Sequence, residues 1–95
     1  MPYVLHNKNT EQIFTCFLVN HYQLVYYGVK FWEDADQANE QFEHFLQEKE
    51  VTHVEGWEIV EMEEGLMKIS NVRLKNDPNQ VIYWDLLGKP ELKRR

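Results

Sequence analysis

The sequence contains a single cysteine, Cys16, and this scarcity excludes two kinds of structural support. One cysteine cannot form a disulfide within the chain, and it cannot supply the paired thiolates of a Cys-x-x-Cys metal site. Chains without disulfides are typical of reducing compartments. The sequence therefore favours a cytoplasmic protein.

The sequence also lacks long apolar runs. A membrane-spanning helix needs about 18 or more consecutive apolar residues, and the 95-residue chain has no such run. Its first residues, MPYVLH, do not show the basic stretch and long apolar stretch of a signal peptide. We therefore expect no membrane partner.

The common catalytic motifs are absent as well. The chain has no glycine-rich phosphate-binding loop, no G-x-S-x-G and no H-E-x-x-H. Its four glycines are isolated from one another, which is typical of turns and bulges. The sequence thus gives no reason to expect catalytic activity, a cofactor or a bound metal.

What the chain has in abundance is acidic charge, and this charge is concentrated in one segment. Residues 33–64 contain twelve acidic residues and one basic residue, Lys49, for a net charge of −11. Residues 1–32 carry +1 and residues 65–95 carry +4, so the chain totals −6. An acidic surface repels nucleic acid and attracts basic proteins. Nucleic acid is therefore an unlikely partner, and a protein with a basic surface is favoured.

The length and the composition indicate one folded domain. A hydrophobic content of 43% and an aromatic content of 14% argue against disorder. Residues 1–90 are expected to form a single α+β domain with one modest core. Residues 91–95 are expected to be a frayed basic tail.

The hydrophobic pattern predicts strands on both sides of one helix. We expect strands at 3–6, 13–19, 22–32, 57–62, 66–74 and 81–86, and a helix at 35–50. This β-β-β-α-β-β-β order is typical of an α+β protein with a twisted antiparallel sheet of five to six strands. The amphipathic helix would pack on one face of that sheet.

The helix has the clearest local signals. Asp34 is expected to be its N-cap, with Gln37 completing a capping box. The apolar residues of the segment fall on one stripe at helical spacing, namely Ala35, Ala38, Phe42, Phe45 and Leu46.

Several turns are expected to join the strands. Asn7–Thr10 and Asn76–Asn79 have strong turn composition, and Asn20–His21 is expected to form a two-residue hairpin turn. A hairpin at Glu64–Gly65 would place Met62 beside Met67 and Glu61 beside Lys68.

The sheet is expected to bury the following core residues: Leu5, Phe14, Phe17, Leu18, Val25, Tyr27, Val29, Phe31, Ala38, Phe42, Phe45, Leu46, Val60, Met62, Ile69, Val72 and Ile82. Residues 13–19 and 22–32 are apolar on both faces, which is typical of central strands. One helix covers only one face, so either the sheet curls on itself or a second subunit covers the other face. A homodimer is therefore one of the expectations.

The candidate partner-binding residues lie on the helix and among the tryptophans: Glu40, Glu43, His44, Glu48, Trp32, Trp57 and Trp84. Glu40 and Glu48 lie one helical turn from His44, but a structural metal needs three or four ligands. A solvated charged face is the simpler interpretation. Likewise, Cys16 lies in the middle of a predicted strand, where an inert core thiol is the usual role.

These features favour a small protein-binding or self-associating module without catalytic activity. One alternative is a small-molecule-binding protein with an aromatic-lined pocket between helix and sheet. A second is an acidic protein that mimics nucleic acid and blocks a nucleic-acid-binding enzyme. A third is contact of the basic C-terminal third with nucleic acid, which salt would weaken steeply.

Overall fold

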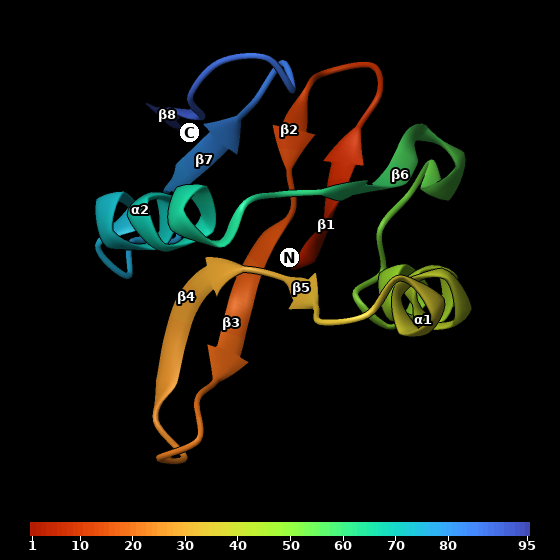
Figure 1. Ribbon diagram of the computed structural model, residues 1–95, viewed down its shortest axis with the longest axis horizontal. Helices are drawn as coiled ribbons and strands as arrows, with labels where there is room; N and C mark the ends of the chain where they lie inside the picture. Colours follow the sequence, from red (N-terminus) through yellow and green to blue (C-terminus); the bar gives the residue numbers. More distant parts are fainter.

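The computed structural model describes residues 1–95 and shows an α+β protein with two helices, a curled antiparallel sheet and a smaller two-stranded sheet (Figure 1). The strands are β1 (Tyr3–Asn7), β2 (Gln12–Ile13), β3 (Thr15–Val19), β4 (Val25–Val29), β5 (Phe31–Trp32), β6 (Trp57–Glu61), β7 (Gln80–Tyr83) and β8 (Glu91–Arg94). The helices are α1 (Ala35–Glu48), α2 (Glu64–Leu74) and a short 3₁₀ helix (Val54–Gly56). No helix has both the length and the apolar character needed to cross a membrane.

Strand β1 is the centre of the larger sheet. Strand β6 pairs along one edge of β1, and β2 and β5 both pair along its other edge, all antiparallel. Strand β7 adds to β2, and β8 adds to β7. Strands β3 and β4 pair only with each other and form the second sheet.

The two faces of β1 are covered by different helices. Val4 belongs to a core cluster beneath α2, and Leu5, the next residue, belongs to a cluster beneath α1. Successive side chains of a strand point to opposite faces, so β1 is buried on both sides. The sequence predicts a helix on only one face of the sheet. In the structure, the second helix, α2, covers the other face of β1.

Helix α1 begins at the predicted N-cap, Asp34, but no hydrogen bond from the Gln37 side chain completes the predicted capping box. The Asp34 side chain accepts hydrogen bonds from the backbone N–H groups of Asp36 and Gln37, at 2.7 and 3.4 Å. These bonds satisfy two of the N–H groups that the first turn leaves unpaired. The helix ends at Glu48, two residues before the predicted end.

Helix α2 replaces a predicted strand, and the predicted hairpin at Glu64–Gly65 is wrong. The buried residues Met67, Ser70 and Leu74 recur at helical spacing. Lys68 consequently lies one turn from Glu64, with its Nζ 3.5 Å from the Glu64 carboxylate, and not across a strand from Glu61.

The predicted frayed tail is also wrong for residues 91–94. These residues form β8 and pair with β7, with Leu92 opposite Ile82. Leu92 packs against the core beneath α2, which gives the charged segment an apolar anchor. Arg94 donates to Asp77 Oδ2 at 3.0 Å.

The predicted continuous strand 13–19 is divided at Phe14 into β2 and β3. The turn after β3 is also longer than the two residues predicted. The Asn20 side chain accepts from the N–H groups of Tyr22 and Leu24, and Gln23 adopts the left-handed conformation at φ 63°. Asparagine side chains commonly stabilise turns in this way.

Most of the predicted core is buried or half-buried, and four of its members are not. Phe17, Val25, Ile69 and Val72 are exposed. The sequence pattern predicts a strand for Ile69 and Val72, but on α2 they fall on the solvent side. Phe17 and Val25 lie on the β3–β4 hairpin beyond the part that the core covers.

Candidate functional site

The acidic face of α1 gathers three of the four predicted helix residues. Glu40, His44 and Glu48 line one hollow of about 370 Å³, together with Trp32 and Lys30. His44 Nε2 lies 2.7 Å from Glu48 Oε1, and both side chains are mostly exposed. Glu43 does not line this hollow. No group of three or more His, Cys, Asp or Glu side chains is arranged to hold a metal ion.

The three predicted tryptophans are buried in the two core clusters. Trp32 and Trp57 lie beneath α1, and Trp84 lies beneath α2. The Trp32 indole N–H donates to Gln41 Oε1 at 3.0 Å, and the Trp84 indole N–H donates to the Gly88 carbonyl at 2.7 Å. These rings stabilise the two core clusters, and they do not form a shared binding surface.

Two ionisable groups, Lys30 and Cys16, lie near the base of the β3–β4 hairpin. Burial lowers the pKa of Lys30, whose Nζ lies 4.8 Å from the centroid of the Trp32 ring. Burial also raises the pKa of the Cys16 thiol, although the nearby Lys49 and Lys30 charges oppose the shift. The raised pKa disfavours the thiolate, which is the reactive form of cysteine.

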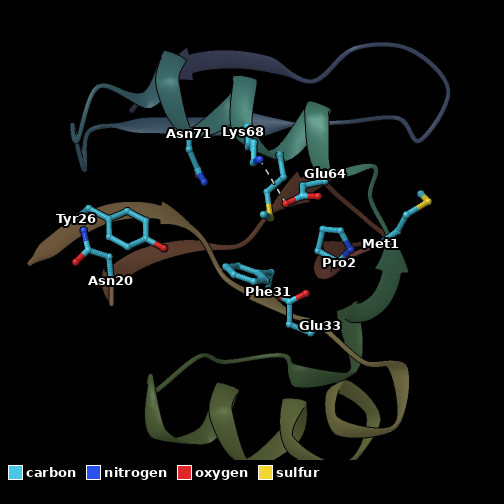
Figure 2. A pocket seen from close by; sticks show the side chains of 10 residues that line it. Met1, Pro2, Asn20, Tyr26, Phe31, Glu33, Glu64, Lys68 and Asn71 are labelled. Carbon is cyan, nitrogen blue, oxygen red and sulfur yellow. Dashed lines mark ion pairs between the residues drawn. The ribbon is translucent and has the colours of Figure 1, made fainter. Parts of the chain in front are cut away.

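A second hollow, of about 430 Å³, lies between α2, the N-terminal residues and the β3–β4 hairpin (Figure 2). Phe31 lies at its centre, with Glu33 and Glu64 near it. Tyr26 and Asn71 line the side next to the hairpin. The hollow is open to solvent and combines the rings of Phe31 and Tyr26 with two carboxylates, and Lys68, which also lines it, lies with its Nζ 3.5 Å from the Glu64 carboxylate.

The most unusual feature of the molecule is the β3–β4 hairpin, which we call the arm (residues 15–29). The chain leaves the edge of β1 at Phe14, whose N–H donates to the Leu5 carbonyl at 3.0 Å. It returns to the same edge at Phe31, which pairs with Val4, the neighbour of Leu5. The Lys30 N–H donates to the Phe14 carbonyl at 3.2 Å and closes the base of the arm. The arm is therefore an excursion from the edge of the main sheet, and Figure 1 shows it extending away from the other strands.

One face of the arm extends beyond the core that covers it. Tyr27 and Val29 lie on this face near the base and are buried beneath α2. Phe17, Val19 and Val25 continue the same face toward the tip. Val19 and Val25 face each other across the two strands and are 60% and 66% exposed. The outer half of the arm thus exposes an apolar surface continuous with the core.

The two edges of the arm differ. The Val29 and Tyr27 N–H groups point outward from β4 and donate to the side chains of Asn71 and Asn76, at 2.9 and 3.1 Å. These asparagines, one on α2 and one just after it, close the edge of β4. The edge of β3 has no such cover, because β3 pairs only with β4.

The arm also lacks charge. Residues 12–29 contain no aspartate, glutamate, lysine or arginine, whereas 27% of the whole chain is charged. Natural proteins usually protect exposed strand edges with charged residues. Several of these residues are predicted to lie in the core, but an uncharged stretch of this length, with a polar turn in its middle, is the signal that marks the arm.

Comparison with known proteins places the chain in no group. No family model matches it, no curated protein resembles it significantly, and no solved structure matches its fold.

Proposed function

We propose that this protein is a non-catalytic protein-binding module and that the outer half of the arm is its contact surface. The observation that carries the proposal is the exposed apolar face formed by Phe17, Val19 and Val25. Tyr22 and Leu24, in the turn at the tip, are also exposed. Contiguous exposed apolar surface of this kind commonly marks a protein interface.

The acidic segment supports a supplementary role. The side chains of Glu40, Glu43 and Glu48 are exposed on α1, at a distance from the uncharged arm. Charges at this position attract a basic partner over a distance and accelerate association more than they increase affinity. The single cysteine, which cannot form a disulfide within the chain, supports a cytoplasmic location.

The test compares two variants that are matched in charge. Val19→Lys with Val25→Glu places opposite charges directly across the arm, so the strands remain paired. Ile69→Lys with Val72→Glu makes the same change at two exposed apolar residues of α2. Each protein is used to capture partners from a native lysate of the source cells, and captured proteins are identified by mass spectrometry.

We expect the wild type and the α2 variant to capture the same protein and the arm variant to lose it. Capture that is unchanged in the arm variant, or lost only in the α2 variant, would move the contact surface away from the arm. Folding of both variants is checked by circular dichroism, so that a loss of capture is not confused with unfolding.

A second candidate function is the binding of a small cationic molecule in the hollow around Phe31. The arrangement that favours it is an aromatic ring near the carboxylate of Glu33, while the nearby Glu64 carboxylate is paired with Lys68. The experiment is a thermal-shift screen of small amines against the wild type and Glu33→Gln. Stabilisation that the variant loses would support this function, and the absence of any stabilising amine would reject it.

A further inference from the structure

We propose that the partner of the arm is a second copy of this chain and that the two copies pair through β3, antiparallel, about a two-fold axis at Leu18. This inference rests on the proposed function and specifies its partner. It follows from the hydrogen-bonding pattern of the arm, from the burial of its residues and from its lack of charge.

The hydrogen-bonding pattern identifies the free groups. In an antiparallel pair, residues alternate between those bonded to the partner strand and those directed outward. The Asn20 N–H donates to the Leu24 carbonyl, and the Lys30 N–H donates to the Phe14 carbonyl. The even-numbered residues of β3 therefore bond to β4, and the backbone groups of Thr15, Phe17 and Val19 point outward.

Burial limits which of these groups another chain can reach. Thr15 is buried, and its hydroxyl forms a 2.7 Å hydrogen bond with the Tyr27 hydroxyl. Phe17 and Val19 are exposed, and their N–H groups have no partner within the chain. The accessible edge therefore runs from Phe17 to Val19.

These two residues fix the register of a symmetric pairing. Phe17 of each copy lies opposite Val19 of the other, and each pair exchanges both backbone hydrogen bonds. The axis then passes beside Leu18, so the two Leu18 side chains meet on the other face. Apolar side chains thus lie beside apolar side chains on both faces of the resulting four-stranded sheet.

The absence of charge makes the arm the place where a second copy can approach. Each copy carries a net charge of −6, so two copies repel each other except where charge is absent. The longest charge-free segment of the chain is the arm with its base, residues 12–29. The tip of the arm points away from the rest of the molecule, so two arms can meet there (Figure 1).

The size of the contact predicts its strength. Only residues 17–19 of each copy pair, so the contact is smaller than the roughly 1,000 Å² that a specific interface usually buries. We therefore expect a dimer that dissociates on dilution and has a measurable monomer–dimer equilibrium.

The first experiment measures molar mass by sedimentation equilibrium over a wide range of protein concentration. Val19→Pro removes the outward N–H of β3 and leaves the bonds to β4 in place. Val25→Pro is the matched control, because Val25 lies opposite Val19 and its N–H points outward from the other strand. We expect the wild type and Val25→Pro to form dimers with dissociation constants that differ by less than tenfold. For Val19→Pro we expect a dissociation constant at least tenfold higher.

The second experiment tests the register with disulfides in a Cys16→Ser background. Residues opposite each other in a non-hydrogen-bonded pair have Cα atoms about 4.5 Å apart, within the range of a disulfide. Leu18→Cys is therefore expected to form a covalent dimer on mild oxidation. Tyr26→Cys is the control, because Tyr26 pairs with Leu18 within the arm and lies one strand further from the axis.

The outcomes separate this inference from the proposed function. A wild type that remains monomeric at millimolar concentration would overturn self-pairing, whereas arm-dependent capture of a different protein would still support the binding module. A dimer that survives Val19→Pro, or that links through Tyr26→Cys and not through Leu18→Cys, would also overturn this pairing. Loss of the dimer in Val19→Pro, together with linkage at Leu18, would support it.

Discussion

His6 and Glu58 face each other across β1 and β6, with His6 Nδ1 2.9 Å from Glu58 Oε2. The other ring nitrogen, Nε2, lies 2.9 Å from the Trp84 carbonyl oxygen, just after β7. The buried His6 side chain therefore links β6 to Trp84, which follows β7. Strand β7 does not pair with β1 itself and joins the sheet through β2.

Replacement of His6 by alanine should lower the free energy of unfolding by about 1–3 kcal/mol, because it leaves the buried Trp84 carbonyl without this partner. The control is His44→Ala, because His44 is an exposed histidine that also faces a carboxylate. Its effect should remain within about 0.5 kcal/mol. Urea unfolding of both variants measures the difference, and equal effects would contradict the structural role of His6.

Asn71→Ala should weaken the attachment of α2 to the arm. It leaves the Val29 N–H without an acceptor, at a cost of about 1–3 kcal/mol. Hydrogen exchange of the Val29 amide should accelerate more than that of amides in α1. Asn39→Ala is the control, because Asn39 bonds only within the exposed surface of α1. An unchanged exchange rate at Val29 would show that Asn71 does not close the β4 edge.

Gly28→Ala should be destabilising because of close packing. A Cβ at this position would lie 2.8 Å from a ring carbon of Tyr26 and 2.9 Å from Asn71 Oδ1. Overpacking of this kind costs about 1–3 kcal/mol. Gly88→Ala meets no atom within 4 Å and should change stability by about 0.5 kcal/mol or less. Thermal unfolding of the two alanine variants provides the comparison.

The Cys16 thiol should react slowly in the folded protein. Burial raises its pKa above the ordinary value of 9.0, so at pH 8 the folded protein contains less thiolate than the unfolded chain. Modification by a disulfide reagent should therefore accelerate when urea is added. Lys30→Met removes one of the charges that lower this pKa and should slow the folded-state reaction further. Equal rates with and without urea would contradict the prediction.

Asp85 should contribute a stability that depends on pH. Its side chain accepts from the N–H groups of Leu87 and Gly88, at 2.9 and 3.0 Å, and the bond from Gly88 is the larger cause of its lowered pKa. Because the folded state binds the proton more weakly than the unfolded state, the contribution is present above the unfolded pKa and is lost as pH falls through the folded pKa. Asp85→Asn should therefore differ most from the wild type at neutral pH and least in strong acid. A pH-independent difference in unfolding free energy would rule out this role.

Local signals in the sequence were sufficient for α1 and for two of the turns. Asp34 has the preference and the position of an N-cap, and its bonds to Asp36 and Gln37 are local. The turn after Asn7 is likewise stabilised by the Asn7 side chain, which accepts from the N–H groups of Asn9 and Thr10. Elements whose stability comes from neighbouring residues are accessible from the sequence.

Helix α2 and the arm could not be predicted in the same way, because distant contacts decide them. In α2 the buried stripe contains the polar Ser70, and Ile69 and Val72 are exposed, so the apolar pattern does not indicate one face. In the arm, apolar residues occupy both faces, which is also typical of a central strand. Only the cover supplied by α2 shows where the core ends and the exposed surface begins.

The candidate site shows the same limit. The sequence predicts a site on the acidic face of α1 and on the tryptophans, because charge and aromatic content are visible in composition. The exposure of Phe17, Val19 and Val25 depends on where the arm departs from the sheet. That point is set by pairing with β1, which lies earlier in the chain.

The departure of the arm from β1 has a consequence for protein engineering. Ile13 and Phe31 pair along the same edge of β1, so the intervening residues can change in number without shifting the register of the main sheet. Foreign peptides could therefore replace the tip between Val19 and Val25 while the body keeps its fold. The chain offers a natural position for displaying a grafted loop on a small scaffold.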